Sequence, residues 1–140
     1  MSGFDLQLRQ LHPYQDKMPR VPVTVLRIAF YAAALFSLFM AGLPQAPVIP
    51  GELNDKFQHM LAFATLAALG SAAYPRTNLF VILIGLSAFG GAIELYQMLP
   101  SVSRDSSWWD WAADTLAAGT VLLFVHLMRV NRRAETPEKA

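Results

Sequence analysis

The 140-residue sequence contains no cysteine, which excludes disulfide bonds, thiolate metal sites and a cysteine nucleophile. Charged residues are also scarce: they make up 15% of the chain, against about 25% of an average soluble domain. Hydrophobic residues make up 54%. This composition is typical of an integral membrane protein rather than a soluble domain. Nothing in the distribution of basic residues indicates binding to nucleic acid.

Four long apolar stretches account for this composition. They cover Thr24–Leu43, Phe57–Tyr74, Leu79–Leu99 and Trp111–Arg129. Each approaches the ~20 residues that an α-helix needs to cross the hydrocarbon core of a membrane. We therefore predict an all-α membrane protein, a four-helix transmembrane bundle over residues 24–130. Residues 1–23 form an N-terminal arm and residues 131–140 a tail. No cleavable signal peptide is expected, because the arm contains no apolar core.

Basic residues flank these stretches unevenly, which predicts the orientation of the chain. Nine of the eleven fall on one side: Arg9, Lys17, Arg20, Arg27, Arg76, Arg129, Arg132, Arg133 and Lys139. Only Lys56 and Arg104 lie in the other two connections. Short segments rich in Lys and Arg are retained in the cytoplasm. We therefore predict a multi-pass protein of the cell (inner) membrane with both termini cytoplasmic.

Ionisable residues that interrupt or border the apolar stretches gather near the opposite, outward end. They are Asp55, Lys56, His59, Glu94, Asp110 and Asp114. Glu94 lies five residues before Leu99, which places it about 7–8 Å below the end of its helix at a rise of 1.5 Å per residue. A charged residue at the centre of a bilayer costs about 2.5–3.5 kcal/mol on the insertion scale. Several such residues at one depth therefore predict a shared polar site.

Each of these positions also has a purely structural interpretation. Asp55 suits a helix N-cap, and Lys56 suits a cation at the membrane interface. The buried polar residues suit a hydrogen-bond network between helices. The tryptophans at 108, 109 and 111 suit an interfacial belt, with ligand stacking as the alternative.

Two motifs carry a resemblance to a known family. Residues 54–59 (Asn-Asp-Lys-Phe-Gln-His) resemble the D-K-x-x-H signature of the VanZ-like family of small multi-pass membrane proteins. Residues 94–97 (Glu-Leu-Tyr-Gln), followed by Arg104 and Asp110, are similar to the later E-x-x-Q motif of that family. Asp114 stands where the family usually has asparagine. The resemblance covers roughly residues 54–125.

The resemblance implies a protein of the cell envelope, in a family named for low-level resistance to the glycopeptide antibiotic teicoplanin. We predict an outward polar pocket that binds an envelope lipid, a phospholipid headgroup or a lipid-linked glycan. Lys56 and Arg104 would contact phosphate, and Glu94 and Gln97 would form hydrogen bonds with sugar hydroxyls. The predicted ligand-binding set is Asp55, Lys56, His59, Glu94, Gln97, Arg104, Asp110 and Asp114. The lipid bilayer and a second copy of the chain are the other candidate partners.

A membrane-embedded enzyme is the alternative function. His59, Glu94 and Asp114 offer a base, an acid and an orienting carboxylate for chemistry on a lipid-linked substrate. A histidine with carboxylates also suits a divalent metal, but the spacing matches no local metal motif, so no metal and no cofactor are predicted. A transporter is disfavoured, because the cytoplasmic halves of the stretches are almost wholly apolar and offer no polar path.

Overall fold

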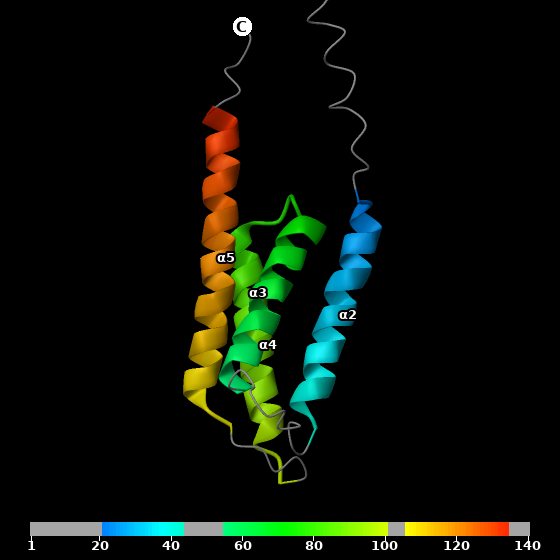
Figure 1. Cartoon of the computed structure of the whole chain (residues 1–140), viewed down its shortest axis with the longest axis vertical. Helices are drawn as coiled ribbons and strands as arrows, with labels where there is room; N and C mark the ends of the chain where they lie inside the picture. The colour runs from blue at the N-terminus through cyan, green and yellow to red at the C-terminus, as the bar shows by residue number, and fades with distance from the viewer. Residues whose placement is uncertain (1–20, 44–54, 101–105, 135–140) are drawn as a thin grey trace, which may run out of the picture.

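The computed structural model describes residues 21–43, 55–100 and 106–134. Within these residues the chain contains helices and no strand, which confirms that the fold is all-α. The helices are α2 (Val23–Ala41), α3 (Asp55–Ala73), α4 (Leu79–Gln97) and α5 (Trp108–Ala134). They lie side by side and alternate in direction, so the start of α2, the α3–α4 turn and the end of α5 share one end (Figure 1).

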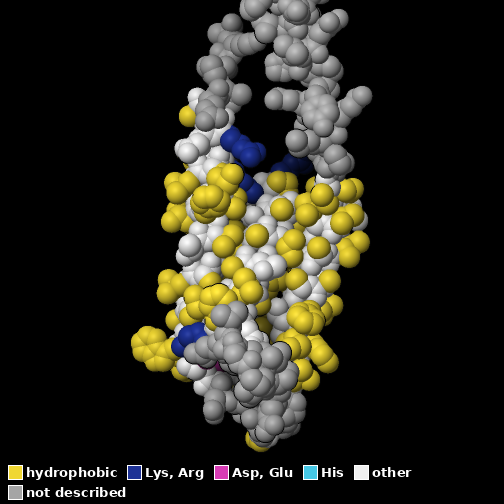
Figure 2. Space-filling model, viewed as in Figure 1, with side chains coloured by type: hydrophobic (Ala, Val, Ile, Leu, Met, Phe, Trp, Pro, Cys, Tyr) yellow, Lys and Arg dark blue, Asp and Glu magenta, His cyan; other side chains and the backbone are white. Residues whose placement is uncertain are grey.

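The two ends of the packed helices differ in charge. The end that carries Arg27, Arg76 and Arg129 is called the basic end below, and most of the dark blue Lys and Arg side chains in Figure 2 lie there. The opposite end, where α3 and α5 begin and α4 finishes, is called the acidic end. It carries Glu94 and Asp110.

Each predicted apolar stretch forms a helix, but the boundaries differ from those predicted. α4 ends at Gln97 rather than Leu99, because the residue before a proline, here Pro100, disfavours helical geometry. α5 begins at Trp108 rather than Trp111, because the Ser107 carbonyl accepts the backbone N–H groups of Asp110 and Trp111 and so starts the helix earlier. α5 also continues to Ala134, so the first residues of the predicted tail are helical.

Three helices are long and apolar enough to cross a membrane: α2, α4 and residues 108–132 of α5. α3 has the same 19-residue length as α2 and α4 but begins with polar residues, and by this measure it is not a candidate. The α2 surface is strongly apolar, with Ile28, Leu35, Phe36 and Phe39 all exposed. Such a surface is costly in water and stable in lipid, which indicates a membrane protein.

The core lies around α3, which packs mainly against α5 and α2, while α4 packs mainly against α5. Phe63 and Leu66 of α3 are the largest fully buried side chains. Ala67 of α3 and Ala118 of α5 are both fully buried within the same cluster. Small residues at a helix interface let the two backbones approach closely. The close packing of α3 on α5 sets the geometry of both ends.

Arginines from two neighbouring helices cap the end of α3. Arg27 Nε of α2 donates to the Ala73 carbonyl at 3.4 Å, and an Arg129 terminal nitrogen of α5 donates to the Ser71 carbonyl at 2.9 Å. The last carbonyls of a helix have no partner within the helix, and cations are favoured there. These contacts fix the basic end of α3 between α2 and α5.

We expect Ala67→Leu to destabilise the protein and Ala72→Leu, on the exposed face of the same helix, to leave it unchanged. Adding a larger side chain to a packed interface costs about 1–3 kcal/mol of unfolding free energy. An exposed substitution changes it by about 0.5 kcal/mol or less. Unfolding in mixed detergent micelles measures both. Equal unfolding free energies for the two variants would contradict the close α3–α5 packing.

Candidate functional site

Two pairs of side chains bridge α3 and α5 at the acidic end. Lys56 Nζ lies 2.8 Å from Asp110 Oδ1, and His59 Nδ1 lies 3.7 Å from Asp114 Oδ2. Residues three or four apart share one helix face, so the pairs follow one another along the interface. We call these four residues the polar ladder.

The polar ladder runs from the surface into the interior. The side chains of the outer pair, Lys56 and Asp110, are 44% and 27% exposed. Those of the inner pair, His59 and Asp114, are 17% and 3% exposed. A buried carboxylate is stabilised only where donors or cations surround it. The outer pair of the ladder is therefore partly open to solvent, whereas the inner pair is largely buried between α3 and α5.

The Asp114 side chain keeps one unused acceptor at the inner end of this route. Oδ2 faces His59, whereas Oδ1 is buried and accepts no hydrogen bond from the part of the chain that the structure describes. Asp110 Oδ1 is also buried, and it meets Lys56 as an ion pair without hydrogen-bond alignment. Most buried polar atoms in proteins have a partner, so an unused carboxylate oxygen marks a place for a donor.

Glu94 joins α4 to the start of α5. Its side chain is almost fully buried, and Oε2 accepts the backbone N–H of Ser107 at 2.8 Å. Ser107 immediately precedes α5, where free N–H groups and the helix dipole favour an anion. The Glu94 carboxyl also lies close enough to interact electrostatically with His59, Asp110 and Asp114. Glu94 of α4 therefore lies near the polar ladder between α3 and α5.

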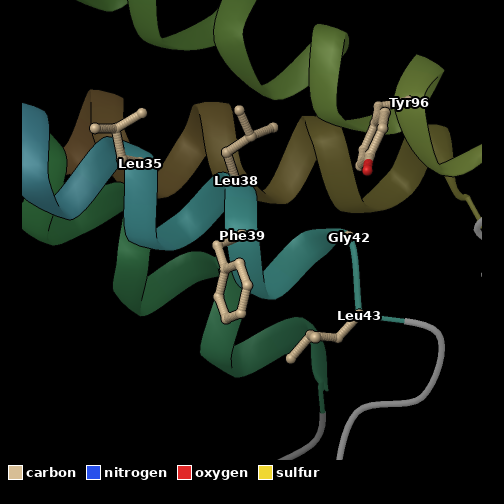
Figure 3. Close-up of a pocket in the computed structure, with 6 residues that line it drawn as sticks. All are labelled: Leu35, Leu38, Phe39, Gly42, Leu43 and Tyr96. Atoms are coloured by element: carbon tan, nitrogen blue, oxygen red, sulfur yellow. The ribbon is translucent and has the colours of Figure 1, made fainter.

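Gln97 has a different environment from the one predicted. Its buried Nε2 donates to the Ala41 carbonyl of α2 at 3.2 Å, so this amide nitrogen joins two helices. Beside it, Tyr96 faces Gly42 across a groove between α2 and α4 (Figure 3). A Cβ at Gly42 would lie 3.0 Å from the Tyr96 ring and hydroxyl, so glycine permits this close approach.

Trp111 has a different environment from Trp108 and Trp109. Trp108 and Trp109 are 59% and 79% exposed, as an interfacial belt requires. Trp111 is less exposed, and its Nε1 donates to the Ser87 carbonyl of α4 at 2.9 Å. The indole also lies near Gly90, where an added Cβ would be 3.4 Å from it. Gly90 and Gly91 of α4 leave the space that the Trp111 indole occupies, and this pair of glycines was the sequence signal for such a contact.

The structure thus brings together Lys56, His59, Glu94, Asp110 and Asp114 of the predicted ligand-binding set. Gln97 contacts α2 instead through its amide nitrogen. The Asp55 side chain and Arg104 lie outside the part of the chain that the structure describes. Ser107 was not predicted, because its role depends on a backbone N–H that has no sequence signature. Among the described residues, no group of three or more His, Asp or Glu side chains is placed to hold a metal ion.

We expect Glu94→Ala to loosen the start of α5, because the Ser107 N–H loses its acceptor. Amide hydrogen exchange measured at Ser107 should then accelerate, by about five- to tenfold for a lost bond of ~1 kcal/mol or slightly more. Glu94→Gln is the matched control, because its amide oxygen can still accept this hydrogen bond. Unchanged exchange in Glu94→Ala would show that the bond does not order the helix start.

In comparisons with known proteins, no family model, no curated protein and no solved structure matches the chain.

Proposed function

We propose that this chain is a VanZ-like integral membrane protein whose polar ladder faces outward and binds the headgroup of an envelope lipid, a glycolipid or a lipid-linked glycan. We also propose that binding at the polar ladder affects envelope integrity or sensitivity to glycopeptide antibiotics. The proposal is supported by the family resemblance of residues 54–59 and 94–97 and by the position of the ladder at one end of the helices.

We propose that all four helices cross the membrane, with both termini in the cytoplasm. α3 is as long as α2 and α4, about 28 Å at 1.5 Å per residue, and its polar residues at the acidic end are paired with α5. Four arginines with described side chains lie at the basic end, at positions 27, 76, 129 and 132. Lys56 lies at the acidic end. This asymmetry favours a cytoplasmic basic end.

The single observation that carries the binding proposal is the unused Asp114 Oδ1 at the bottom of the ladder. A sugar hydroxyl or an ammonium group is a donor that this oxygen would accept. Lys56 at the outer end is 44% exposed and offers a point charge to a phosphate. Lys56 lies in the first turn of α3, whereas Asp114 lies further along the neighbouring helix α5 and is more deeply buried. Together they suit a headgroup that carries both an anion and hydrogen-bond donors.

An acid–base enzyme acting on a lipid-linked substrate is the second proposal. The observation that favours it is the arrangement of His59 Nδ1 toward the buried Asp114 carboxylate. A carboxylate in this position orients an imidazole for proton transfer. Turnover of a bound lipid-linked substrate, lost in His59→Gln while binding is kept, would distinguish catalysis from binding alone.

The orientation is tested with reporters fused after Ala140. We expect a reporter that is active only in the cytoplasm to work, and one that is active only outside to fail, because basic segments are retained inside. The reverse result would overturn the proposed orientation and would place the polar ladder on the cytoplasmic side.

The binding proposal is tested by native mass spectrometry of the protein extracted gently from its own membrane. We expect the wild-type protein to carry a phosphate-containing lipid or glycolipid. Lys56→Gln should weaken its retention about fivefold, the effect of about 1 kcal/mol for one basic residue near a membrane surface. Asp114→Asn should carry one bound lipid or glycolipid fewer than the wild-type protein while it keeps its helical content.

Arg76→Gln is the matched control, because it removes one positive charge at the opposite end. Equal retention in the wild-type protein, Lys56→Gln and Asp114→Asn would overturn ligand binding at the ladder. A drop in thermal stability of Asp114→Asn with no adduct in any sample would instead assign the ladder to packing.

A further inference from the structure

A second site lies away from the polar ladder, in the seam where α2 and α4 make few contacts. In the basic half of this seam, α2, α3 and α4 enclose a groove of ≈ 450 Å³. Its walls are almost wholly apolar and include Phe30, Ala34, Gly70, Val81, Gly85 and Phe89. An apolar groove between helices in a membrane is in contact with lipid tails. The shape of the groove and the polar residues at its open end therefore determine which lipid binds there.

The groove is long enough for part of a hydrocarbon chain. Val81 and Phe89 are eight residues apart on α4, or about 12 Å at 1.5 Å per residue. Gly85 lies midway between them, and a Cβ built on it would have no neighbouring atom within 4 Å. The missing side chain therefore leaves the middle of the groove open.

The mouth of the groove is polar and carries a positive charge. The Arg27 guanidinium lies over the Tyr74 ring, 5.1 Å from its centroid, and Tyr74 lines the groove. Arg27 uses Nε to reach the Ala73 carbonyl. Among the described residues, the two terminal nitrogens of Arg27 form no hydrogen bond. Arg27 lies about 6 Å from the start of α2, and a long basic side chain near the end of an apolar helix can extend toward lipid phosphates.

Two tyrosines complete the mouth. The Tyr31 and Tyr74 hydroxyls share a hydrogen bond of 2.8 Å, and both residues line the groove. One proton lies between the two oxygens, and the accepting hydroxyl keeps its own proton for a further acceptor. The mouth thus offers a cation beside a hydroxyl donor.

We propose that this groove binds one anionic phospholipid, with an acyl chain between α2 and α4 and the phosphate at Arg27 and the tyrosine pair. This site is independent of the polar ladder and of the function proposed for it. Basic pockets between membrane helices favour anionic headgroups. A helix of a second copy fits less well, because it would bury the Arg27 charge against apolar side chains without a partner.

The experiment uses the full chain in nanodiscs that contain phosphatidylcholine and phosphatidylglycerol in equal amounts, followed by native mass spectrometry after release. We expect the wild-type protein to retain one phosphatidylglycerol in preference to phosphatidylcholine. Arg27→Gln should reduce this preference about fivefold, because one basic residue near the headgroups is removed. Arg132→Gln, which removes a charge on α5 at the same end, should not reduce it.

A second variant tests the groove without changing charge. Gly85→Leu places a side chain in the open middle of the groove and should reduce retention of both lipids. Ala32→Leu, on the exposed side of α2, is the control and should retain them as the wild-type protein does.

Three results would overturn the proposal. The first is a phosphatidylglycerol preference that survives Arg27→Gln. The second is lipid retention that survives Gly85→Leu. The third is a dimer of the wild-type protein that Gly85→Leu dissociates, which would assign the groove to a second copy of this chain.

Discussion

A buried carboxylate in an apolar surrounding needs a donor, and this requirement organises the acidic end of the molecule. Glu94 meets it with the backbone N–H of Ser107. That contact holds the beginning of α5 against the end of α4. Once α5 starts at this point, Asp110 and Asp114 fall one turn apart on the face that meets Lys56 and His59 of α3. The ladder between α3 and α5 therefore depends on a bond between α4 and α5.

α2 is less buried than the other helices. No residue of α2 except Ala41 is buried, and most of its long side chains face outward. It is attached near its ends, where Arg27 reaches the Ala73 carbonyl and the Ala41 carbonyl accepts from Gln97. The middle of α2 packs Phe30, Ala33 and Ala34 against the core and exposes apolar side chains on its other side. The grooves along the α2–α4 seam follow from this arrangement.

The sequence was sufficient to predict the helices and which end is polar, because both depend on composition along a single segment. It identified Glu94 and Asp114, since a carboxylate in an apolar stretch is unusual wherever the helix rotates. It did not predict that Lys56 pairs with Asp110, which requires knowing that α3 neighbours α5. The contacts of Gln97 and Trp111 were also missed, because each is made to a backbone carbonyl of a neighbouring helix. Backbone acceptors are present at every residue, so no pattern of side chains reveals which one is used.

α3, the least apolar of the three 19-residue helices, is tied by charge at both of its ends. Lys56 holds its first turn to α5, and arginines from α2 and α5 hold its last carbonyls. Helices usually adjust to bilayer thickness by tilting or sliding. A helix tied at both ends cannot slide without breaking ion pairs and hydrogen bonds. The position of His59 relative to α5 is therefore set by contacts within the protein, and the inner pair of the ladder stays at the same level of α5 whatever surrounds the helices.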